Sequence, residues 1–436
     1  MPGNKTEVRT SVLFLGLTEQ MFKDYNRAET EHLFRGGVAL EPTILLIDMN
    51  AFFASVHQAL DPGLRGKPVV VCGDREQRRG IVLAASYEAK KYGVKTGMTA
   101  WEARTLLPHG IYVRPDYGQY LAFSRRILQI IREYSPLVEP FSIDEAFVDL
   151  KGCEGLFGDV LTVAREMKRR IREEVGVTCS VGIGPNKLVA KMAAELEKPD
   201  GLTLLRGEDV PRRLWPLPVR ELFGVGSRTE RKLQAMGIKT IGDLANFPVE
   251  VLERRFGIIG RVLHMSANGI DYSPVSPGSL ETAKSIGNQM TLPRDYASYR
   301  ELRAAILELA EMVGRRVRQG GYEGKTVSLT LRDSELHFYS WSASLWEYSD
   351  LTEDIYRQAC TLLERYWPEG KRVRLVGVGL SKLRPKTALQ LDVFGEKLKL
   401  ERLNQTCDLI RERFGRYSIM RGGTLTEAGI HYGQRE

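Results

Sequence analysis

The sequence predicts a multidomain protein in which an α/β block, a mainly helical unit and a small α+β domain follow one another. The chain has 436 residues, of which 43% are hydrophobic, and this length exceeds what one ordinary core organises. Strand and helix patterns interleave from Thr43 to about residue 203, whereas residues 204–273 have mainly helical periodicity. The stretch DYSPVSPGS, rich in Pro and Ser, then reads as a linker to the last domain.

The α/β block opens with a strand that ends in an acidic residue and runs directly into a helix. ILLID has the pattern of a buried strand, and NAFFASVHQAL has apolar positions that suit a helix. GKPVVVCGD and RGIVLAASYEAKKYGVKTGM read as strand, turn, strand and short helix, punctuated by Gly93 and Gly97. A strand that ends in an acid before a helix is a common place for chemistry.

Three further patterns complete this block. Tyr120 to Tyr134 has helical periodicity, and VEPFSIDEAFVDL alternates like a pair of strands. Val160 to Val175 has the pattern of an amphipathic helix and precedes the strand TCSVGIG. These patterns extend the alternation of strands and helices.

The last domain shows strands interrupted by two helices. The helices are expected at Tyr299–Gln319 and Thr352–Trp367, and the strands around KTVSLTLR, SWSASL and RVRLVGVGLSKL. We therefore expect two helices over a sheet. Beyond it, LERLNQTCDLIRERFG is typical of an amphipathic helix whose function the sequence does not reveal.

The composition is permissive for nucleic-acid binding and gives no sign of a zinc or disulfide protein. Lys and Arg total 63 against 55 Asp and Glu, for a formal charge of +8, which favours polyanions such as nucleic acid or anionic membrane. The five cysteines form no C-x-x-C pair and the six histidines are dispersed, so reduced thiols are expected and any metal must lie on carboxylates. No apolar run approaches a membrane span and the N-terminus lacks signal-peptide features, which predicts a cytoplasmic protein.

Three acidic residues are candidates for a metal site. Asp48 ends the ILLID strand, and Asp144 and Glu145 lie in SIDEAFVDL at a predicted strand or hairpin. Carboxylates on neighbouring strands can bind two Mg²⁺ ions, which supports phosphoryl transfer without a covalent protein nucleophile. Taken singly, each acid is better explained as a strand-end cap, for Asp48, or as part of a solvated pair, for Asp144 and Glu145.

The joint pattern of five motifs resembles a known family. IDMNAFFASV, VVVCGD, SYEAKKYGVKTGM, SIDEAFVDL and SVGIGPNKLVAKMAAELEKPDG occur in this order. The chain thereby resembles the Y-family, lesion-bypass DNA polymerases of the bacterial DNA polymerase IV type, over roughly Thr43 to Phe394. The resemblance implies a translesion polymerase that adds deoxynucleotides to a primer 3′ end in DNA repair.

The fold implied by this resemblance is a right hand with a ferredoxin-like palm, small fingers, a helical thumb and a little-finger domain. The expected boundaries are an extension at 1–42, palm at 43–57 and 117–203, fingers at 58–116, thumb at 204–273, linker at 274–283, little finger at 284–386 and a clamp-binding peptide with tail at 387–436.

The resemblance also implies roles in the active site. Asp48, Asp144 and Glu145 become the carboxylates that bind two Mg²⁺ ions, with Mn²⁺ as a substitute and the Met49 carbonyl as a further ligand. Phe53 matches the steric gate that excludes a ribose 2′-hydroxyl. The alternative for Phe53 is a core phenylalanine, as we expect for its neighbour Phe52.

Tyr87, Lys90 and Lys187 match the positions that hold the incoming triphosphate through charge-assisted contacts. Two of the chain's residues depart from the family's pattern. Many relatives have Arg where this chain has Lys90, and Lys offers a point charge rather than a bidentate fork. Many also have a third acid where this chain has Asn50, which puts local metal or water tuning in doubt.

DNA and protein contacts are expected outside the palm. FGVGSRTERKLQAMGIKTIGDLA resembles a helix-hairpin-helix in which Gly224 and Gly226 let backbone N–H groups approach a phosphate. KRVRLVGVGLSKLRPK places basic side chains near or on a sheet edge, where Arg372 and Arg374 can follow a DNA backbone or simply be solvated. These basic residues are Lys371, Arg372, Arg374, Lys382, Arg384 and Lys386.

ALQLDVFGE resembles the peptide with which bacterial polymerases dock on the sliding clamp. Its anchors are Gln390, Leu391 and Phe394. By composition alone, a peptide of this kind is equally explained as the end of a strand.

The partners that follow are primer-template DNA, deoxynucleoside triphosphates and the bacterial sliding clamp, bound by a monomer without membrane contact. Three alternatives remain: a non-catalytic mutasome scaffold, a nucleotide cyclase with a similar palm, and a plain DNA-binding protein. A scaffold typically loses the acids, a cyclase needs no thumb hairpin, and a plain DNA-binding protein shows no dependence on magnesium.

Overall fold

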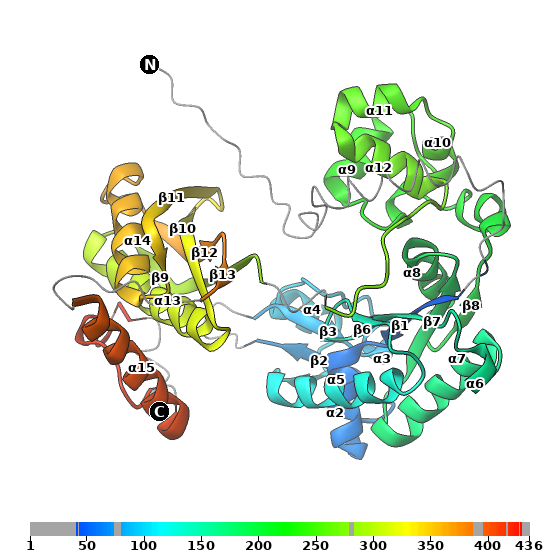
Figure 1. Ribbon diagram of the computed structural model, residues 1–436, viewed down its shortest axis with the longest axis horizontal. Coiled ribbons are helices and arrows are strands. Elements are labelled where there is room, and N and C mark those ends of the chain that lie inside the picture. The colour runs from blue at the N-terminus through cyan, green and yellow to red at the C-terminus, as the bar shows by residue number, and fades with distance from the viewer. Residues whose placement is uncertain are drawn as a thin grey trace. The chain divides into compact units, whose positions relative to one another are not determined.

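The computed structural model describes residues 41, 43–73, 80–278, 283–386, 396–415, 417–426 and 428–429 (Figure 1). The described residues fall into two compact units, one up to residue 278 and one from residue 283 onward. The first unit contains a five-stranded sheet, a three-stranded sheet and a set of helices. The second contains a five-stranded sheet, in which the short fifth strand pairs beside the four-strand path, together with its own helices.

The five-stranded sheet has the strand order β5-β6-β1-β7-β8. The central strand β1 pairs antiparallel with both β6 and β7, whereas β7 and β8 are parallel. Side chains alternate between the two faces of a strand, so Leu45 and Ile47 enter the main core while Leu46 lies on the opposite face. The strands are β1 (Ile44–Met49), β5 (Val138–Pro140), β6 (Glu145–Asp149), β7 (Cys179–Gly184) and β8 (Leu202–Leu204).

Helices cover both faces of this sheet (Figure 1). One face packs on α2, α5 and α7 in a single apolar core. The other packs on α8, where Ala190 and Ala194 contact Leu46 and Phe147. A Cβ at Gly182 would lie 2.0 Å from the Ala190 carbonyl oxygen, so glycine is required for this close approach. The helices are α2 (Phe52–Leu60), α5 (Tyr117–Arg132), α6 (Glu154–Phe157), α7 (Val160–Arg170) and α8 (Lys187–Leu196).

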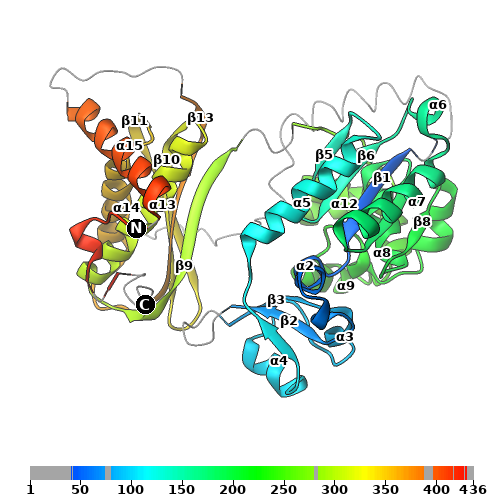
Figure 2. The ribbon, with the colours of Figure 1, turned by 90° about the horizontal axis from the view of Figure 1, so that it is seen from below.

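A smaller lobe contains the three-stranded sheet, with strand order β3-β2-β4 (Figure 2). Its core is made of small and branched side chains such as Val70, Val82 and Ala103. Ser86 caps the helix that follows β3, because its hydroxyl accepts the Ala89 N–H. The elements are β2 (Val69–Cys72), β3 (Val82–Ala85), α3 (Tyr87–Lys90), α4 (Ala100–Leu106) and β4 (Ile111–Val113).

Residues 205–268 form the helical part of the first unit. Its core is shared with α8, whose Leu188, Val189 and Met192 pack among the helical side chains. Thr240 and Asp243 form a reciprocal capping box at the start of α10. The helices are α9 (Ser227–Gln234), α10 (Ile241–Ala245), α11 (Val249–Phe256) and α12 (Ile258–Ala267).

The second unit confirms the expected arrangement of two helices over a sheet. The strand order is β11-β10-β12-β9, and α13 and α14 bury their apolar sides against one face. The helix α13 has the bounds that the periodicity predicts. The elements are β9 (Ser285–Tyr296), α13 (Tyr299–Gln319), β10 (Tyr322–Asp333), β11 (Phe338–Ser349), α14 (Thr352–Tyr366), β12 (Val373–Ser381) and β13 (Arg384–Pro385).

The expectation of a position on a sheet edge does not hold for the strand that carries Arg374. The strand β12, which carries Arg374, lies between β10 and β9 and is therefore an interior strand rather than an edge. Its core residues Val376, Val378 and Leu380 explain this position, since a strand with apolar side chains packs best between two neighbours. The basic residues expected near the edge instead lie mostly before and after this strand.

The C-terminal helix α15 (Glu396–Phe414) is ion-paired to the second unit. Asp408 on α15 lies 2.7 Å from Arg318 Nε, and Arg411 lies 2.8 Å from Glu311. Both pairs are largely shielded from solvent, so this helix is a packed part of the unit. Among the helices that the structure describes, none is both long and apolar enough to cross a membrane.

Candidate active site

The sheet brings the three predicted carboxylates together. Asp48 near the end of β1 lies directly opposite Glu145, the first residue of β6, in the antiparallel register. The Met49 N–H donates to the Asp144 carbonyl at 3.0 Å, which fixes the turn before β6 beside the end of β1. Ser142 Oγ donates to the Asp144 carboxylate at 2.6 Å. Residues about a hundred positions apart therefore form one acidic group.

A bound cation would stabilise the charged form of the buried carboxylates in this group. Burial raises the pKa of Asp48 to about 7, opposed by Lys198 and reinforced by a hydrogen bond to Glu145. Burial also raises the pKa of Asp144. Burial would raise the pKa of Glu145 too, but the hydrogen bond from Asp48 and the charge of Lys191 lower it. A set of buried carboxylates whose charges compete is a fitting site for Mg²⁺, which prefers oxygen ligands.

Two lysines already occupy the edge of the acidic group. Lys198 Nζ lies 2.8 Å from Asp48 Oδ2, and Lys191 Nζ lies 2.5 Å from Glu145 Oε1. Both come from α8 and the turn that follows it. Neither lysine was singled out from the sequence, although Lys198 stands in the motif-bearing stretch EKPDG.

Asn50 holds this turn in place. Its side chain is 2% exposed, its Oδ1 accepts the Asp200 N–H at 2.9 Å, and its Nδ2 donates to Ser180 Oγ at 2.9 Å. An amide both donates and accepts, whereas a carboxylate only accepts. The departure at Asn50 thus has a local structural reason, since it ties the turn after Lys198 to β7.

The structure does not bring Lys187 into the acidic group. Lys187 Nζ lies 2.9 Å from Glu139 Oε2 and donates to the Pro274 carbonyl at 3.2 Å. The ammonium also lies 5.3 Å from the centre of the Phe147 ring. The cation that does contact the carboxylates from the end of α8 is Lys198.

Tyr87 and Lys90 lie close to Lys198. The Lys90 ammonium stands 4.3 Å over the Tyr87 ring. Burial raises the pKa of Tyr87, and Lys198 and Asp48 are the next influences upon it. Burial and then repulsion by Lys198 lower the pKa of Lys90. The charges of Lys198 and Asp48 therefore act on both Tyr87 and Lys90, which makes this region suitable for a polyanion.

The aromatic ring of Phe53 on α2 packs against two tyrosines of α5. Its ring stacks on Tyr120 with centroids 4.1 Å apart and meets the edge of Tyr117. Phe52 is 3% exposed and belongs to the core, whereas Phe53 is only partly buried. Tyr120 is fixed in turn because its hydroxyl hydrogen-bonds His57 Nε2 at 2.9 Å. The ring of Phe53 is therefore a rigid and partly accessible surface.

The residues predicted to contact DNA differ in how accessible they are to a phosphate. Gly224 has φ of +93°, and Gly226 is the N-cap of α9 with open space where a Cβ would stand. Arg372 is exposed, whereas Arg374 Nε lies 3.2 Å from Asp295 Oδ1. Arg374 therefore has a partner within the sheet. The predicted clamp anchors Gln390, Leu391 and Phe394 lie outside the described residues.

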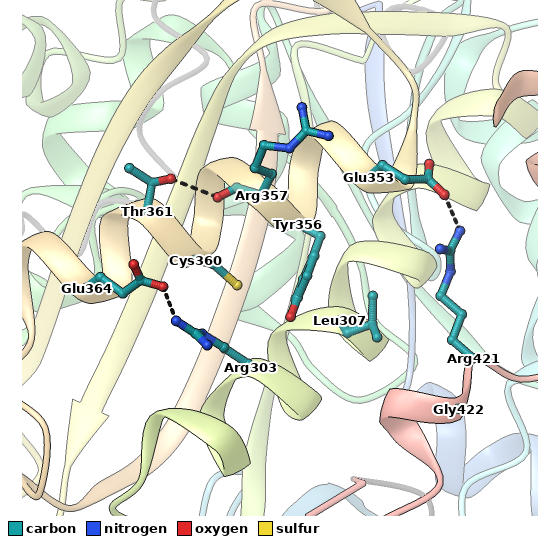
Figure 3. Close-up of a pocket in the computed structure, with 10 residues that line it drawn as sticks. All are labelled: Arg303, Leu307, Glu353, Tyr356, Arg357, Cys360, Thr361, Glu364, Arg421 and Gly422. Carbon is teal, nitrogen blue, oxygen red and sulfur yellow. Dashed lines mark hydrogen bonds and ion pairs between the residues drawn. The ribbon is translucent and has the colours of Figure 1, made fainter. Parts of the chain in front are cut away.

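The second unit contains an open pocket of about 850 Å³ between α13, α14 and the segment near Arg421 (Figure 3). Arg303 is ion-paired with Glu364, and Arg421 with Glu353, so these charges in the lining are matched. None of the predicted site residues lines this pocket. The pocket is lined by Arg303, Leu307, Glu353, Tyr356, Arg357, Cys360, Thr361, Glu364, Arg421 and Gly422.

Family models match most of the chain. The impB/mucB/samB family matches residues 47–195, and the C-terminal domain of that family matches residues 283–393. A model described as the thumb domain of DNA polymerase-iota matches residues 220–271. The matched segments follow the order of the sheet, helical and C-terminal parts of the structure.

Individual relatives cover nearly the whole chain. The chain is 59% identical to DNA polymerase IV of Moorella thermoacetica over 397 residues, which is 91% of this chain and 99% of that protein. It is 57% identical to DNA polymerase IV of Pelotomaculum thermopropionicum, over 89% of this chain and 96% of that protein. A solved Y-family DNA polymerase chimera is similar with a TM-score of 0.69 and 29% identity, covering 78% of this chain and 98% of its own.

Proposed function

Since this chain belongs to the Y family of DNA polymerases and is a translesion DNA-directed DNA polymerase, we propose that Asp48, Asp144 and Glu145 form its catalytic metal site. The main support is the register of β1 and β6, which sets Asp48 opposite Glu145 and beside the turn that contains Asp144. Its substrates are DNA and deoxynucleoside triphosphates. Magnesium-dependent extension of a primed template that disappears in Asp144→Ala is the test of this assignment.

The metal site is proposed to take two Mg²⁺ ions, with Mn²⁺ as a substitute and the Met49 carbonyl as a further ligand. Polymerases of this family depend on metal, and bound Mg²⁺ would lower the pKa of the primer 3′-hydroxyl and neutralise charge on the leaving pyrophosphate. The three carboxylates hold the ions, while Ser142 orients Asp144 through its hydrogen bond. No protein nucleophile is required.

The incoming triphosphate is proposed to bind at Tyr87, Lys90 and Lys198. The support is the proximity of Lys198 to Asp48 and the mutual influence of these groups on their pKa values. Charge-assisted contacts to phosphate oxygens suit both ammonium groups. In the protein without nucleotide, the Asp48 carboxylate pairs with the Lys198 ammonium. A bound triphosphate would replace Asp48 as an anionic partner of Lys198.

Comparing Lys198→Ala with Lys187→Ala tests which lysine binds nucleotide. We expect Lys198→Ala to weaken deoxynucleotide binding at least about tenfold, since one charge-assisted contact is worth roughly 1.5–3 kcal/mol. Lys187→Ala should have the smaller effect because that ammonium contacts Glu139 and the Pro274 carbonyl, outside the acidic group. Single-turnover rates over a range of nucleotide concentration give both binding constants. A larger effect at Lys187 would restore the assignment that its sequence motif suggests.

DNA is proposed to be held without sequence readout by the loop at Gly224 and Gly226 and by basic residues of the second unit. Open space at Gly226 and the positive φ of Gly224 support close approach of a phosphate to backbone N–H groups. Arg372 is the better candidate for a backbone contact, because Arg374 already pairs with Asp295. Such contacts make DNA affinity strongly salt-dependent.

The sliding clamp is proposed to bind Gln390, Leu391 and Phe394. Truncation before Gln390 would also remove α15, which is ion-paired through Asp408 and Arg411, so point substitutions are the sharper test. Replacing the three anchors together by alanine should cut clamp stimulation at least about tenfold while basal extension persists, since the tether that raises local concentration is lost. Leu409→Ala, an exposed leucine of α15, is the control.

Stimulation that survives the triple substitution would put the clamp contact elsewhere in the chain. The protein is also proposed to be a monomer, with the palm at 43–57 and 117–203, fingers at 58–116, thumb at 204–273 and little finger at 284–386.

A further inference from the structure

Two aromatic rings beside Lys191 have no part in the site described so far. The Lys191 ammonium stands 5.4 Å from the centre of the Phe141 ring and 5.3 Å from that of Phe223. The two rings meet edge to face with centroids 6.2 Å apart. The same ammonium contacts Glu145 Oε1 at 2.5 Å. We call these three residues, Phe141, Lys191 and Phe223, the aromatic–lysine cluster.

The aromatic–lysine cluster joins three separate elements of the first unit. Phe141 lies between β5 and β6, Lys191 lies on α8, and Phe223 lies in the loop before α9. The Phe223 N–H points at Met192 Sδ at 3.4 Å, which ties this loop to α8. The cluster therefore links the glycine loop at Gly224 and Gly226 with a proposed metal ligand.

Two properties of the cluster suit contact with a ligand. Phe141 is 38% exposed and Phe223 is 44% exposed. Two large apolar side chains are therefore accessible to solvent beside a polar site. The Lys191 side chain is only 12% exposed, because its stem and ammonium are enclosed by the rings and Glu145. A cation held between aromatic faces is restricted in where it can point.

We propose that the aromatic–lysine cluster seats the 3′-terminal nucleotide of the primer and keeps Glu145 in position. This rests on the proposed function, which puts the reacting 3′-hydroxyl at the carboxylates and a duplex phosphate at the Gly224 and Gly226 loop. The primer strand must run between these two places, and the cluster lies on that path. The exposed rings meet the terminal sugar and base, and Lys191 attracts the adjacent backbone phosphate.

Lys191 is a positioning residue in this proposal. Its ammonium fixes Glu145 Oε1, while Ser142 Oγ lies 3.5 Å from Glu145 Oε2. Phe141 and Phe223 prevent the ammonium from turning away into solvent. Lys191 thus contacts the catalytic carboxylate directly and Phe223 of the glycine loop through its ring. A duplex held at the glycine loop is thereby aligned with the carboxylate where the reaction occurs.

Binding of primer ends without metal tests the seat separately from catalysis. Fluorescence anisotropy in EDTA would compare a hairpin DNA with a recessed 3′ end against a closed dumbbell of equal length that has no end. We expect Phe223→Ala to weaken binding of the recessed end about threefold or more, since base and sugar contacts with aromatic rings carry measurable affinity. Binding of the dumbbell should be unchanged.

Single-turnover incorporation tests the positioning of Glu145. Lys191→Met should lower the maximal rate about tenfold, because displaced ligands lose catalytic alignment. The nucleotide concentration for half-maximal rate should stay unchanged. Lys191→Arg should restore most of the rate, because it returns a cation to the same place, whereas a purely structural loss would not give this split.

A second cluster in the same unit supplies matched controls. Phe157 is 38% exposed and packs on Tyr134 at 5.2 Å, and Arg170 lies over Tyr134 and pairs with Glu133. Phe157→Ala and Arg170→Met remove the same types of contact away from the carboxylates. We expect both to keep the wild-type rate and primer-end binding.

The proposal is overturned if Phe223→Ala weakens both DNAs equally, or if Lys191→Met keeps the wild-type maximal rate. It is likewise overturned if the two control variants lose as much as their partners. Thermal melts and the Lys191→Arg rescue separate these results from misfolding. Failure of the proposed function looks different, because Asp144→Ala would then retain synthesis whatever the cluster variants do.

Discussion

Replacing Asp144 by alanine is expected to reduce primer extension at least about a thousandfold, since loss of metal-held charge costs several kcal/mol in the transition state. Asp144 is bound to the end of β1 through its carbonyl and oriented by Ser142, so its carboxylate is fixed toward the site. Binding of primer-template DNA should persist, because the glycine loop and the second unit are untouched. Single-turnover extension and anisotropy measure the two properties.

The matched control for Asp144→Ala is Asp149→Ala at the far end of β6. The Asp149 carboxylate accepts the Lys151 N–H at 2.9 Å and lies away from the register pair of Asp48 and Glu145. We expect Asp149→Ala to extend primers like the wild type. Full synthesis by Asp144→Ala would remove it from the metal site, and equal losses in both variants would indicate damage to the sheet.

Replacing Phe53 by alanine is expected to reduce discrimination against ribonucleotides about a hundredfold, since loss of steric fit in a pocket is worth roughly 1–3 kcal/mol. The ring is held flat by Tyr120 at 4.1 Å and by the edge of Tyr117. An alanine leaves room for a 2′-hydroxyl at this place. The ratio of incorporation efficiency for deoxynucleotide and ribonucleotide measures the change.

Phe53→Tyr is the control for this substitution, because it keeps the stacked ring and should keep the discrimination. Thermal melts are needed as well, since truncating a half-buried aromatic ring destabilises a fold by about 1–3 kcal/mol. Sugar selectivity that stays at the wild-type level in Phe53→Ala would assign Phe53 to the core, as its neighbour Phe52 is.

The fold was largely predictable because its elements have strong periodicity. The 21-residue helix α13 combines an apolar stripe with a capping box at Ser298 and Glu301, so both its period and its start are encoded locally. The position of β12 inside its sheet was not predictable, because strand order depends on contacts between distant strands. Charged residues around β12 suggested an edge, but Val376 and Val378 required a neighbour on each side.

The candidate site was likewise only partly predictable from the sequence. The grouping of Asp48 with Glu145 follows from motifs at strand positions, and the register brings them face to face. The choice between Lys187 and Lys198 depends on whether the start of α8 or the turn after its end lies beside the carboxylates, and both lysines lie in one continuous motif. The role of Asn50 also needed the structure, since its partners Ser180 and Asp200 are far along the chain.

Counting the metal ions bound in the assembled complex is a direct test of the two-metal site. Electron paramagnetic resonance would titrate Mn²⁺ into the protein with a dideoxy-terminated primer-template and the matching nucleotide, so that no reaction occurs. We expect about two tightly bound Mn²⁺ per wild-type complex, as a two-metal site requires, and fewer in Asp144→Ala. Equal binding by the wild type and Asp144→Ala would contradict the assignment of Asp48, Asp144 and Glu145 as the metal site.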